Sequence, residues 1–358
     1  MTDPFAAEQA VAIAAVRRAC SLTTAVFNNL VKGETLVKDD KTPVTVADLS
    51  AQAVINTILG HAFPSDPIVG EEDAADLRVN ETLRDRVTQL ANDVLEPSPQ
   101  ILAGEKSTWG LGKRWSADEL LQAIDRGNYE GGRNGRMWTL DPIDGTKGFL
   151  RGGQYAVCLA LLVDARVQLG VIGCPNLPLD PASPDGARGA LFVAVRGGGT
   201  HQLPLTASST IPPIPLRMPV LSLDGLSFLE SVEKAHAALD TNARVAQHLG
   251  VTREPVRMDS QAKYCALARG DNGGGVYLRL PTGVGYREKI WDHAAGSLLV
   301  EEAGGVVSDM RGQSLDFGLG RTLGENFGVI AAGKAVHSKI IEGIRVVKEQ
   351  DASTEGTS

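Results

Sequence analysis

The stretch Trp138–Gly153, WTLDPIDGTKGFLRGG, joins the end of an apolar run to a tightly turning acidic segment. Asp141 and Asp144 follow the apolar residues, and Pro142 stiffens the turn between them. Two carboxylates held this close repel each other unless a cation lies between them. Hard cations such as magnesium select oxygen ligands, and the backbone carbonyl of Ile143 could supply another oxygen. The stretch therefore predicts part of a divalent-metal site.

A phosphate-binding element could follow directly in the same stretch. Gly145 lets the chain fold tightly, and Thr146 and Lys147 come next. If a helix begins here, its free N–H groups and its dipole would suit a phosphate. The alternative is an Asx-type turn that caps a helix, which accounts for the DPID segment as well as a metal site does. It accounts for the whole stretch poorly.

Two further acidic segments could bring carboxylates to the same site. In VGEED, Glu71 follows a predicted buried strand, although a solvated acidic turn is an alternative. In IWDHAAGSLLVEEAGG, Asp292 falls in the first turn of a strongly helical stretch, where it could also compensate the helix dipole. Together with Asp141 and Asp144, these residues describe a multi-magnesium site that bridges a phosphate and activates a water. Such a site needs no covalent nucleophile.

Composition limits the class of protein. The 358 residues are 43% hydrophobic and 22% charged, which is typical of a globular protein of about two domains. The net charge of −8 argues against a broad surface for nucleic acid or an anionic membrane. We find no secretory signal and no run of about 20 apolar residues, so we expect no membrane helix. A cytoplasmic setting with reduced core thiols fits the scattered cysteines Cys20, Cys158, Cys174 and Cys265.

Hydrophobic periodicity predicts the elements of the first part of the chain. Residues 4–32 form an amphipathic pattern typical of a helix, and a second helix is expected from about 46 to 59. The polar region 74–136, with helices near 76–95 and 116–127, indicates an insertion or a solvent-facing lobe. From 138 to 195, short β-type runs between turn residues predict an antiparallel meander.

The proline-rich stretch TIPPIPLRMPV, residues 210–220, is the best candidate for a domain boundary. Beyond it, helices expected at 238–249, 260–269, 290–303 and 334–348 alternate with strands, which indicates an α/β domain. We therefore expect an α+β domain over 1–210 with most metal ligands, an α/β domain over 211–350 with Asp292 and substrate-binding residues, and a disordered tail at 351–358.

The segments GEED, WTLDPIDGTKGF and IWDHAAGSLLVEEAGG resemble the signature set of the lithium-sensitive, magnesium-dependent phosphatases that include inositol monophosphatase. Their order and separation fit as well, and the resemblance extends from the first helix to about residue 346. It implies a layered α+β or α/β sandwich of alternating helices and sheets (αβαβα), with the site between two halves. The metal ligands that it implies are Glu71, Asp141, the Ile143 carbonyl, Asp144 and Asp292.

The resemblance also assigns the attacking water and the pocket. It implies that Asp48, in PVTVADLS, pairs with Thr146 to orient or deprotonate water, although Asp48 alone would be an ordinary helix N-terminal residue. SVEKAHAALD, MDSQAKYCALARG and VYLRLPTGVGYREKIWDHAAG are more similar to the 3'(2'),5'-bisphosphate nucleotidases within the superfamily. The substrate contacts implied are Gly145, Thr146, His236, Ser260, Lys263 and Arg279. The glycines at 273–275 depart from the pattern and could alter the pocket rim.

A bisphosphate has a second phosphate away from the metals, which fixed cations such as Lys263 and Arg279 could hold. Either cation could instead be an ordinary surface residue of its helix or strand. The resemblance implies hydrolysis of the 3'-phosphate of adenosine 3',5'-bisphosphate to AMP and phosphate, with the sulfated analogue as a further candidate substrate. The alternatives are an inositol (poly)phosphate 1-phosphatase with the same mechanism and a catalytically silent sensor of phosphometabolites.

The same resemblance implies the cofactors and partners. We expect two or three Mg²⁺ ions, inhibition by Li⁺, and Na⁺ as a further candidate inhibitor. The expected partner is a small nucleotide bisphosphate, with no nucleic acid and no membrane, and the protein is expected to be a monomer.

Overall fold

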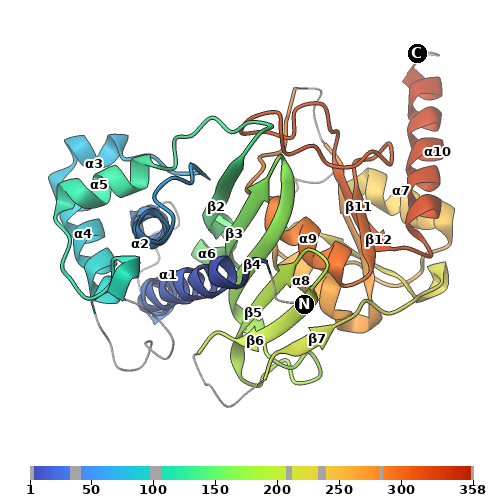
Figure 1. The fold of residues 1–358 in the computed structure, drawn as a ribbon. Helices are drawn as coiled ribbons and strands as arrows, with labels where there is room; N and C mark the ends of the chain where they lie inside the picture. Colours follow the sequence, from blue (N-terminus) through green and yellow to red (C-terminus); the bar gives the residue numbers. More distant parts are fainter. Residues whose placement is uncertain are drawn as a thin grey trace.

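Helices and sheets alternate in layers across the molecule (Figure 1). The computed structural model describes residues 4–32, 42–96, 107–206, 212–232, 239–281 and 285–355. In order, the layers are the helices α1 (Ala6–Lys32) and α2 (Thr42–Ala62), a seven-stranded sheet, the helices α8 (Ala262–Arg269) and α9 (Ala294–Glu302), a five-stranded sheet, and the helices α7 (Leu239–Leu249) and α10 (His337–Glu355). The predicted αβαβα sandwich is confirmed.

The first sheet is almost wholly antiparallel, as the meander predicted. Its strands lie in chain order: β1 (Ile68–Gly70), β2 (Arg136–Asp144), β3 (Ala156–Val163), β4 (Arg166–Pro178), β5 (Arg188–Val195), β6 (Gly199–Pro204) and β7 (Ile214–Leu216). The exception is β1, which runs parallel to β2 with Gly70 opposite Leu140. Parallel strands end at the same edge of a sheet, so the residues after Gly70 and Leu140 become neighbours.

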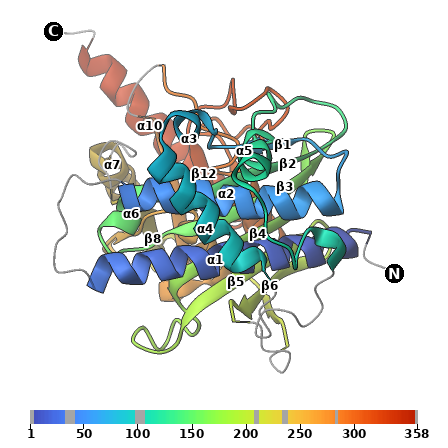
Figure 2. The same cartoon turned by 90° about the vertical axis from the view of Figure 1, so that its left-hand side faces the viewer.

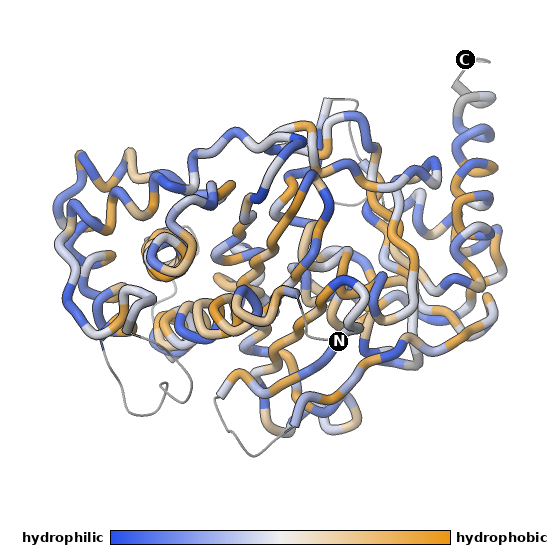
Figure 3. Tube along the Cα trace, in the orientation of Figure 1, coloured by the Kyte–Doolittle hydropathy of each residue, from blue (hydrophilic) through white to orange (hydrophobic). Residues whose placement is uncertain are grey.

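Both faces of the central strands β2–β5 are buried, which explains why these strands are nearly continuous apolar runs. On β3, Leu159 and Leu161 pack with α1 and α2, while Cys158 and Ala160 pack with α8 and α9. The apolar residues accordingly concentrate along the central strands, and the outermost helices carry more hydrophilic residues (Figure 3). All four cysteines are free and buried.

The second sheet carries the other half of the site. Its strand order is β11-β12-β10-β8-β9, with β8 (Ser227–Glu230), β9 (Val256–Arg257), β10 (Gly275–Arg279), β11 (Gly305–Ser308) and β12 (Val329–Gly333). One face meets α8 and α9, and the other is covered by α7 and α10. The division of the chain at residue 210 stays a prediction, but the first sheet continues past that point to Leu216.

The polar region 74–136 packs against α2 through three helices, α3 (Ala75–Val79), α4 (Glu81–Leu95) and α5 (Ala117–Asp125). Figure 2 shows α4 crossing in front of α1 and α2. The single helix predicted near 76–95 is broken at Asn80, whose side chain accepts a hydrogen bond from the Leu83 backbone N–H and caps α4. Trp109 and Trp115 are buried there, so the region contributes to the core.

Two findings at the ends of the chain differ from the sequence-based predictions. Helix α10 continues to Glu355, so the predicted disordered tail is wrong over residues 351–355; Arg244 pairs with Asp351 there. Residues 356–358 lie outside the described residues. Helix α1, over Ala6–Val31, is long and apolar enough to cross a membrane by length and composition. However, 61% of this apolar segment is buried, and the core helices of soluble proteins can be equally long and apolar. The length and composition of α1 are therefore weak evidence for a membrane span.

Candidate active site

The first part of the site forms where β1 and β2 end together. The Glu71 backbone N–H donates to Leu140 O at 3.2 Å, which continues the parallel pairing beyond β1. The side chains of Glu71 and Asp141 therefore meet, and they share a hydrogen bond. Burial, followed by the charge of Glu72, raises the pKa of Glu71 to about 7. The parallel pairing explains how an acidic loop 70 residues away in sequence joins the DPID segment.

A β-bulge in β2 orients the second carboxylate, that of Asp144. Asp141 lies opposite Cys158 and Asp144 lies opposite Ala156, so the intervening pair of residues in β2 faces a single residue of β3. The bulge turns Asp144 toward α8, where its Oδ2 accepts a hydrogen bond from the Gln261 backbone N–H. Pro142 has no N–H to donate to the strand ladder, which is compatible with this interruption.

A short helix begins immediately after the bulge, which meets the condition stated for a phosphate-binding element in this stretch. Gly145 has φ +86° and caps α6 (Thr146–Leu150). A side chain at Gly145 would bring its Cβ to 3.0 Å from the Ser260 Cβ, so the close approach of the two segments requires glycine. Ser260 itself has a positive φ of 67°. At this contact Ser260 thus has a strained backbone, and Gly145 has no side chain.

These segments line a cavity of about 380 Å³ between the two sheets. The predicted residues in its wall are Glu71, Asp141, Ile143, Asp144, Gly145, Thr146, Ser260, Lys263, Arg279 and Asp292. The structure therefore brings together side chains that are as far apart in sequence as Glu71 and Asp292. Sequence reasoning missed several other wall residues, among them Asp259, Tyr286 and Lys289.

The carboxylates in the cavity raise one another's pKa. Burial, and then the charges of Glu71 and Asp144, raise the pKa of Asp141 well above its ordinary value. Burial is also the main cause of the raised pKa values of Asp144 and Asp292. The Oδ1 atom of Asp141 is buried without a hydrogen-bond partner among the described residues. An oxygen-rich set with mutual repulsion and an unpaired buried oxygen fits a hard divalent cation.

Asp48 lies behind this carboxylate cluster rather than in the cavity wall. It belongs to α2 and is 3% exposed, and its Oδ1 has no hydrogen-bond partner in the described structure. Burial and then the charges of Glu72 and Glu71 raise its pKa. Thr146 faces the cavity from the start of α6. The pairing of Asp48 with Thr146 stays a prediction.

Two cations face the carboxylates from the second half of the molecule. Lys263 on α8 is 2% exposed, so it is not the solvated helix residue that was the alternative. Its Nζ donates to Met258 O at 3.0 Å and to Ser260 O at 2.8 Å, and burial lowers its pKa to about 8. Arg279, at the end of β10, lies 3.6 Å from the Asp292 carboxylate. A phosphate held here would meet a buried lysine and a fixed guanidinium.

Arg279 is held by a residue that sequence reasoning missed. Its Nε and Nη2 each lie 2.8 Å from a carboxylate oxygen of Glu288. Burial would raise the pKa of Glu288, but the charges of Arg279 and His293 outweigh it and lower that pKa to about 2. His293 in turn contacts the Tyr264 hydroxyl at 2.8 Å. Only the acidic character of the EKIWDH segment hinted at this network.

Glu288, Asp292 and His293 also place their ligand atoms within 4.8 Å of one another. Arg279 and His293 already occupy both oxygens of Glu288, however, so this group supports the cavity wall, and Asp292 is its member that lines the cavity. His293 therefore supports the wall through Glu288 and Tyr264. Asp292 precedes α9 instead of lying in its first turn, because α9 begins at Ala294.

Two sequence-based expectations about the pocket have other outcomes. His236 lies outside the described residues. Of the glycines at 273–275, Gly274 and Gly275 are not part of the cavity wall: a Cβ at Gly274 would meet Leu221, and one at Gly275 would meet Leu229. Their role is to let β10 approach its neighbours closely.

Comparison with known proteins agrees with this geometry. A sequence model of the inositol monophosphatase family matches residues 5–349. A relative from Schizosaccharomyces pombe named 3'(2'),5'-bisphosphate nucleotidase is 51% identical, over 97% of this chain and 97% of its own. One of the same name from Emericella nidulans is 48% identical, over 95% of this chain and 98% of its own.

Solved structures share the fold at lower identity. CysQ from Bacteroides thetaiotaomicron, described as a bacterial member of the inositol monophosphatase family, has a TM-score of 0.57 and 20% identity, over 92% of this chain and 98% of its own. Mycobacterium tuberculosis SuhB has a TM-score of 0.56 and 18% identity, over 97% of this chain and 98% of its own. The layered fold, the match over nearly the whole chain and the full-length relatives together show that this chain belongs to the inositol monophosphatase family.

Proposed function

We propose that this protein is a phosphomonoesterase that hydrolyses the 3'-phosphate of adenosine 3',5'-bisphosphate to AMP and phosphate. The observation that carries the proposal is the convergence of Glu71, Asp141, Asp144 and Asp292 with Lys263 and Arg279 in one cavity. Its volume of about 380 Å³ is within the range of small-molecule sites. The names of relatives at 40–51% identity support the nucleotide as the substrate.

Divalent metal is the proposed cofactor, with two or three Mg²⁺ ions held by Glu71, Asp141, the Ile143 carbonyl, Asp144 and Asp292. Bound magnesium would polarise phosphate oxygens, neutralise the leaving group and lower the pKa of a water. The buried, unpaired Oδ1 of Asp141 and the mutual repulsion of the carboxylates support this assignment. Lithium is the proposed inhibitor and sodium a second candidate, which a titration of turnover with each salt tests.

The chain's own residues position the reactants. The Thr146 hydroxyl orients the attacking water at the start of α6. Asp48 accepts a proton from the pair formed by that water and the Thr146 hydroxyl. Gly145 leaves the backbone N–H groups of α6 open to the phosphate that reacts. Lys263 and Arg279 hold the second phosphate, which in turn keeps Lys263 charged near its pKa of about 8. Glu288 keeps the Arg279 guanidinium in one orientation.

The sulfated analogue, 3'-phosphoadenosine 5'-phosphosulfate, presents the same 3'-phosphate and is proposed as a second substrate. An inositol phosphate would use the same carboxylates, but an inositol monophosphate has no second anion for Lys263 and Arg279. The cation pair therefore favours a bisphosphate, and the names of the relatives favour a nucleotide.

A substrate panel tests the proposal. Phosphate release is measured with magnesium and with chelator for adenosine 3',5'-bisphosphate, its sulfated analogue, inositol 1-phosphate and inositol 1,4-bisphosphate. We expect magnesium-dependent turnover that is highest for the adenosine bisphosphate, and none with Asp144→Asn as the matched control. Equal or faster turnover of an inositol phosphate would reject the nucleotide assignment, and activity in chelator would reject the metal assignment.

A further inference from the structure

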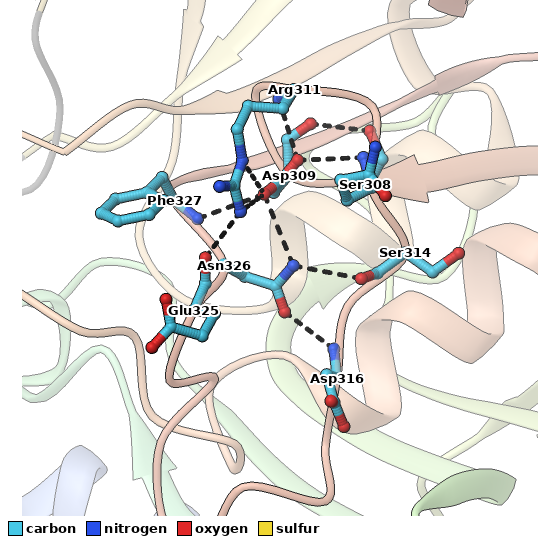
Figure 4. A network of polar contacts seen from close by, with 9 residues as sticks. Ser308, Asp309, Arg311, Ser314, Asp316, Glu325, Asn326 and Phe327 are labelled. Carbon is cyan, nitrogen blue, oxygen red and sulfur yellow. Dashed lines mark hydrogen bonds and ion pairs between the residues drawn. The ribbon is translucent and has the colours of Figure 1, made fainter.

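The connection between β11 and β12, residues 309–328, is an ordered strap that crosses from the second sheet toward the first (Figure 1). Figure 4 shows the clamp that shapes it. The fully buried Asp309 accepts hydrogen bonds from the backbone N–H groups of Arg311 at 2.8 Å and Gln313 at 3.0 Å, and from the Arg311 guanidinium. Asn326 donates to Ser314 O at 3.1 Å, which ties the outgoing and returning arms together.

The strap carries Arg321 to the edge where β1 ends. Its Nη1 donates to Gly127 O and to Tyr129 O, each at 3.0 Å, and its Nη2 donates to Gly70 O. Gly70 is the last residue of β1 and immediately precedes Glu71. One guanidinium from the second half of the molecule therefore fixes the backbone that presents a carboxylate from the first half.

The same residue also contacts the segment that presents Asp292. The Arg321 guanidinium lies 4.9 Å from the centre of the Trp291 ring, and Trp291 immediately precedes Asp292. The Arg321 carbonyl accepts a hydrogen bond from the Ile290 backbone N–H at 3.2 Å. Arg321 thus contacts the backbone that precedes Glu71 through its guanidinium, and the segment that precedes Asp292 through both its guanidinium and its carbonyl.

We propose that Arg321 is a positioning residue that sets the spacing between Glu71 and Asp292 and thereby tunes the affinity of the cavity for divalent cations. It contacts the neighbours of both carboxylates and is not itself in the cavity wall. The proposal rests on the metal dependence proposed above. Residues that orient metal ligands from behind commonly change metal affinity about 10- to 100-fold when they are replaced.

The sign of the effect separates positioning from simple electrostatics. A positive charge near the site repels divalent cations, so its removal would tighten their binding if charge alone mattered. Loss of positioning weakens binding instead. Arg321→Met removes both the charge and the fork of donors, whereas Arg321→Lys keeps the charge and loses the fork.

The test measures Mn²⁺ binding to the purified protein by electron paramagnetic resonance of the free ion, at pH 8.5 and without substrate. The matched control is Arg133→Met, because Arg133 ties the same strap to the loop before β2 through Asp316 at 2.7 Å. The ion pair between Arg133 and Asp316 involves neither Gly70 nor Trp291. We expect Kd to rise about tenfold or more in Arg321→Met, to rise less in Arg321→Lys, and to stay unchanged in Arg133→Met.

Steady-state kinetics provide the second readout. We expect Arg321→Met to need a higher magnesium concentration for half-maximal rate, with kcat at saturating magnesium near that of the wild type. Unchanged or tighter Mn²⁺ binding in both Arg321 variants would overturn the inference, as would equal weakening in Arg133→Met. If Arg321→Met does not fold, Arg321→Lys decides alone. Absence of Mn²⁺ binding in the wild type would instead reject the proposed metal dependence, and this inference with it.

Discussion

Replacing Glu71 by glutamine is expected to stabilise the metal-free protein at pH 8 while it weakens metal binding. Burial and the charges of Glu72 and Asp144 raise the pKa of Glu71 from the ordinary 4.5 to about 7. The glutamine amide has no charge to bury, and it can donate to Asp141, so the contact between the two side chains is kept. The substitution therefore removes an electrostatic penalty without leaving a cavity.

The magnitude follows from the pKa. A change from 4.5 to about 7 corresponds to about 3.4 kcal/mol, at about 1.36 kcal/mol per pH unit. Although protein atoms surround Glu71 closely enough to raise its pKa, the residue is also exposed to water, which screens its neighbours' charges, so we expect only about 1–2 kcal/mol of added stability. The unfolded chain loses this proton near pH 4.5 and the folded chain near pH 7. The contribution of Glu71 to the stability of the wild type therefore falls as pH rises between these values, and the penalty from this residue is complete above pH 7.

Urea unfolding followed by circular dichroism measures the effect at pH 4.5 and pH 8 in chelator. The advantage of Glu71→Gln should be absent at pH 4.5 and complete at pH 8. Glu81→Gln is the control, because Glu81 is 81% exposed on α4 and away from the cavity. Magnesium at about 100 times its Kd should add about 2.7 kcal/mol to the wild type and less to Glu71→Gln, which reverses their order. Lower stability of the variant in chelator at pH 8, or equal stabilisation of both proteins by magnesium, would refute the reasoning.

Three further substitutions test other parts of the site. Lys263→Met should raise KM for adenosine 3',5'-bisphosphate by about 10- to 100-fold but raise it less for 3'-AMP, because it removes charge-assisted hydrogen bonds to the second phosphate. Steady-state kinetics with both substrates measure the two KM values. An equal rise for both substrates would count against the role assigned to Lys263. Gly145→Ala should lower the free energy of unfolding in urea by about 1–2 kcal/mol, since φ is +86° and the new Cβ would lie 3.0 Å from the Ser260 Cβ. An unchanged free energy of unfolding would contradict the cap geometry. Arg279→Met should lower the free energy of unfolding by about 3–5 kcal/mol at pH 7, because it leaves Glu288 charged and buried. Adding Glu288→Met to the same chain should recover much of that loss. If it recovers none, the broken ion pair is not the cause.

Local signals predicted the elements that present the site. The glycine after DPID and the helix that begins at Thr146 are encoded within a few residues, and the structure has both, but the turn expected at DPID is a β-bulge within β2. The alternation of short strands and helices also predicted an α/β arrangement beyond residue 210, whereas the full layered sandwich was implied by the family resemblance. These features depend on backbone preferences and on hydrophobic period, which act over short distances along the chain.

Contacts between distant segments could not be predicted in this way. Nothing local in VGEED indicates that β1 pairs in parallel with β2, although this pairing places Glu71 beside Asp141. The burial of Lys263 depends on the second sheet, and the partner of Arg279 depends on how the chain returns to Glu288. The contact from Arg321 to Gly70 spans 251 residues and involves a backbone carbonyl, which leaves no residue-type signal.

We propose that carboxylates from both halves of the molecule bind divalent cations together in one cavity. Anomalous diffraction from crystals soaked in Mn²⁺ tests it most directly, because the peaks locate the ions without reference to activity. We expect peaks within coordination distance of Glu71, Asp141, Asp144 and Asp292, and loss of those peaks in Asp144→Asn crystals. Peaks confined to Glu288 and His293, or to surface carboxylates outside the cavity, would contradict it.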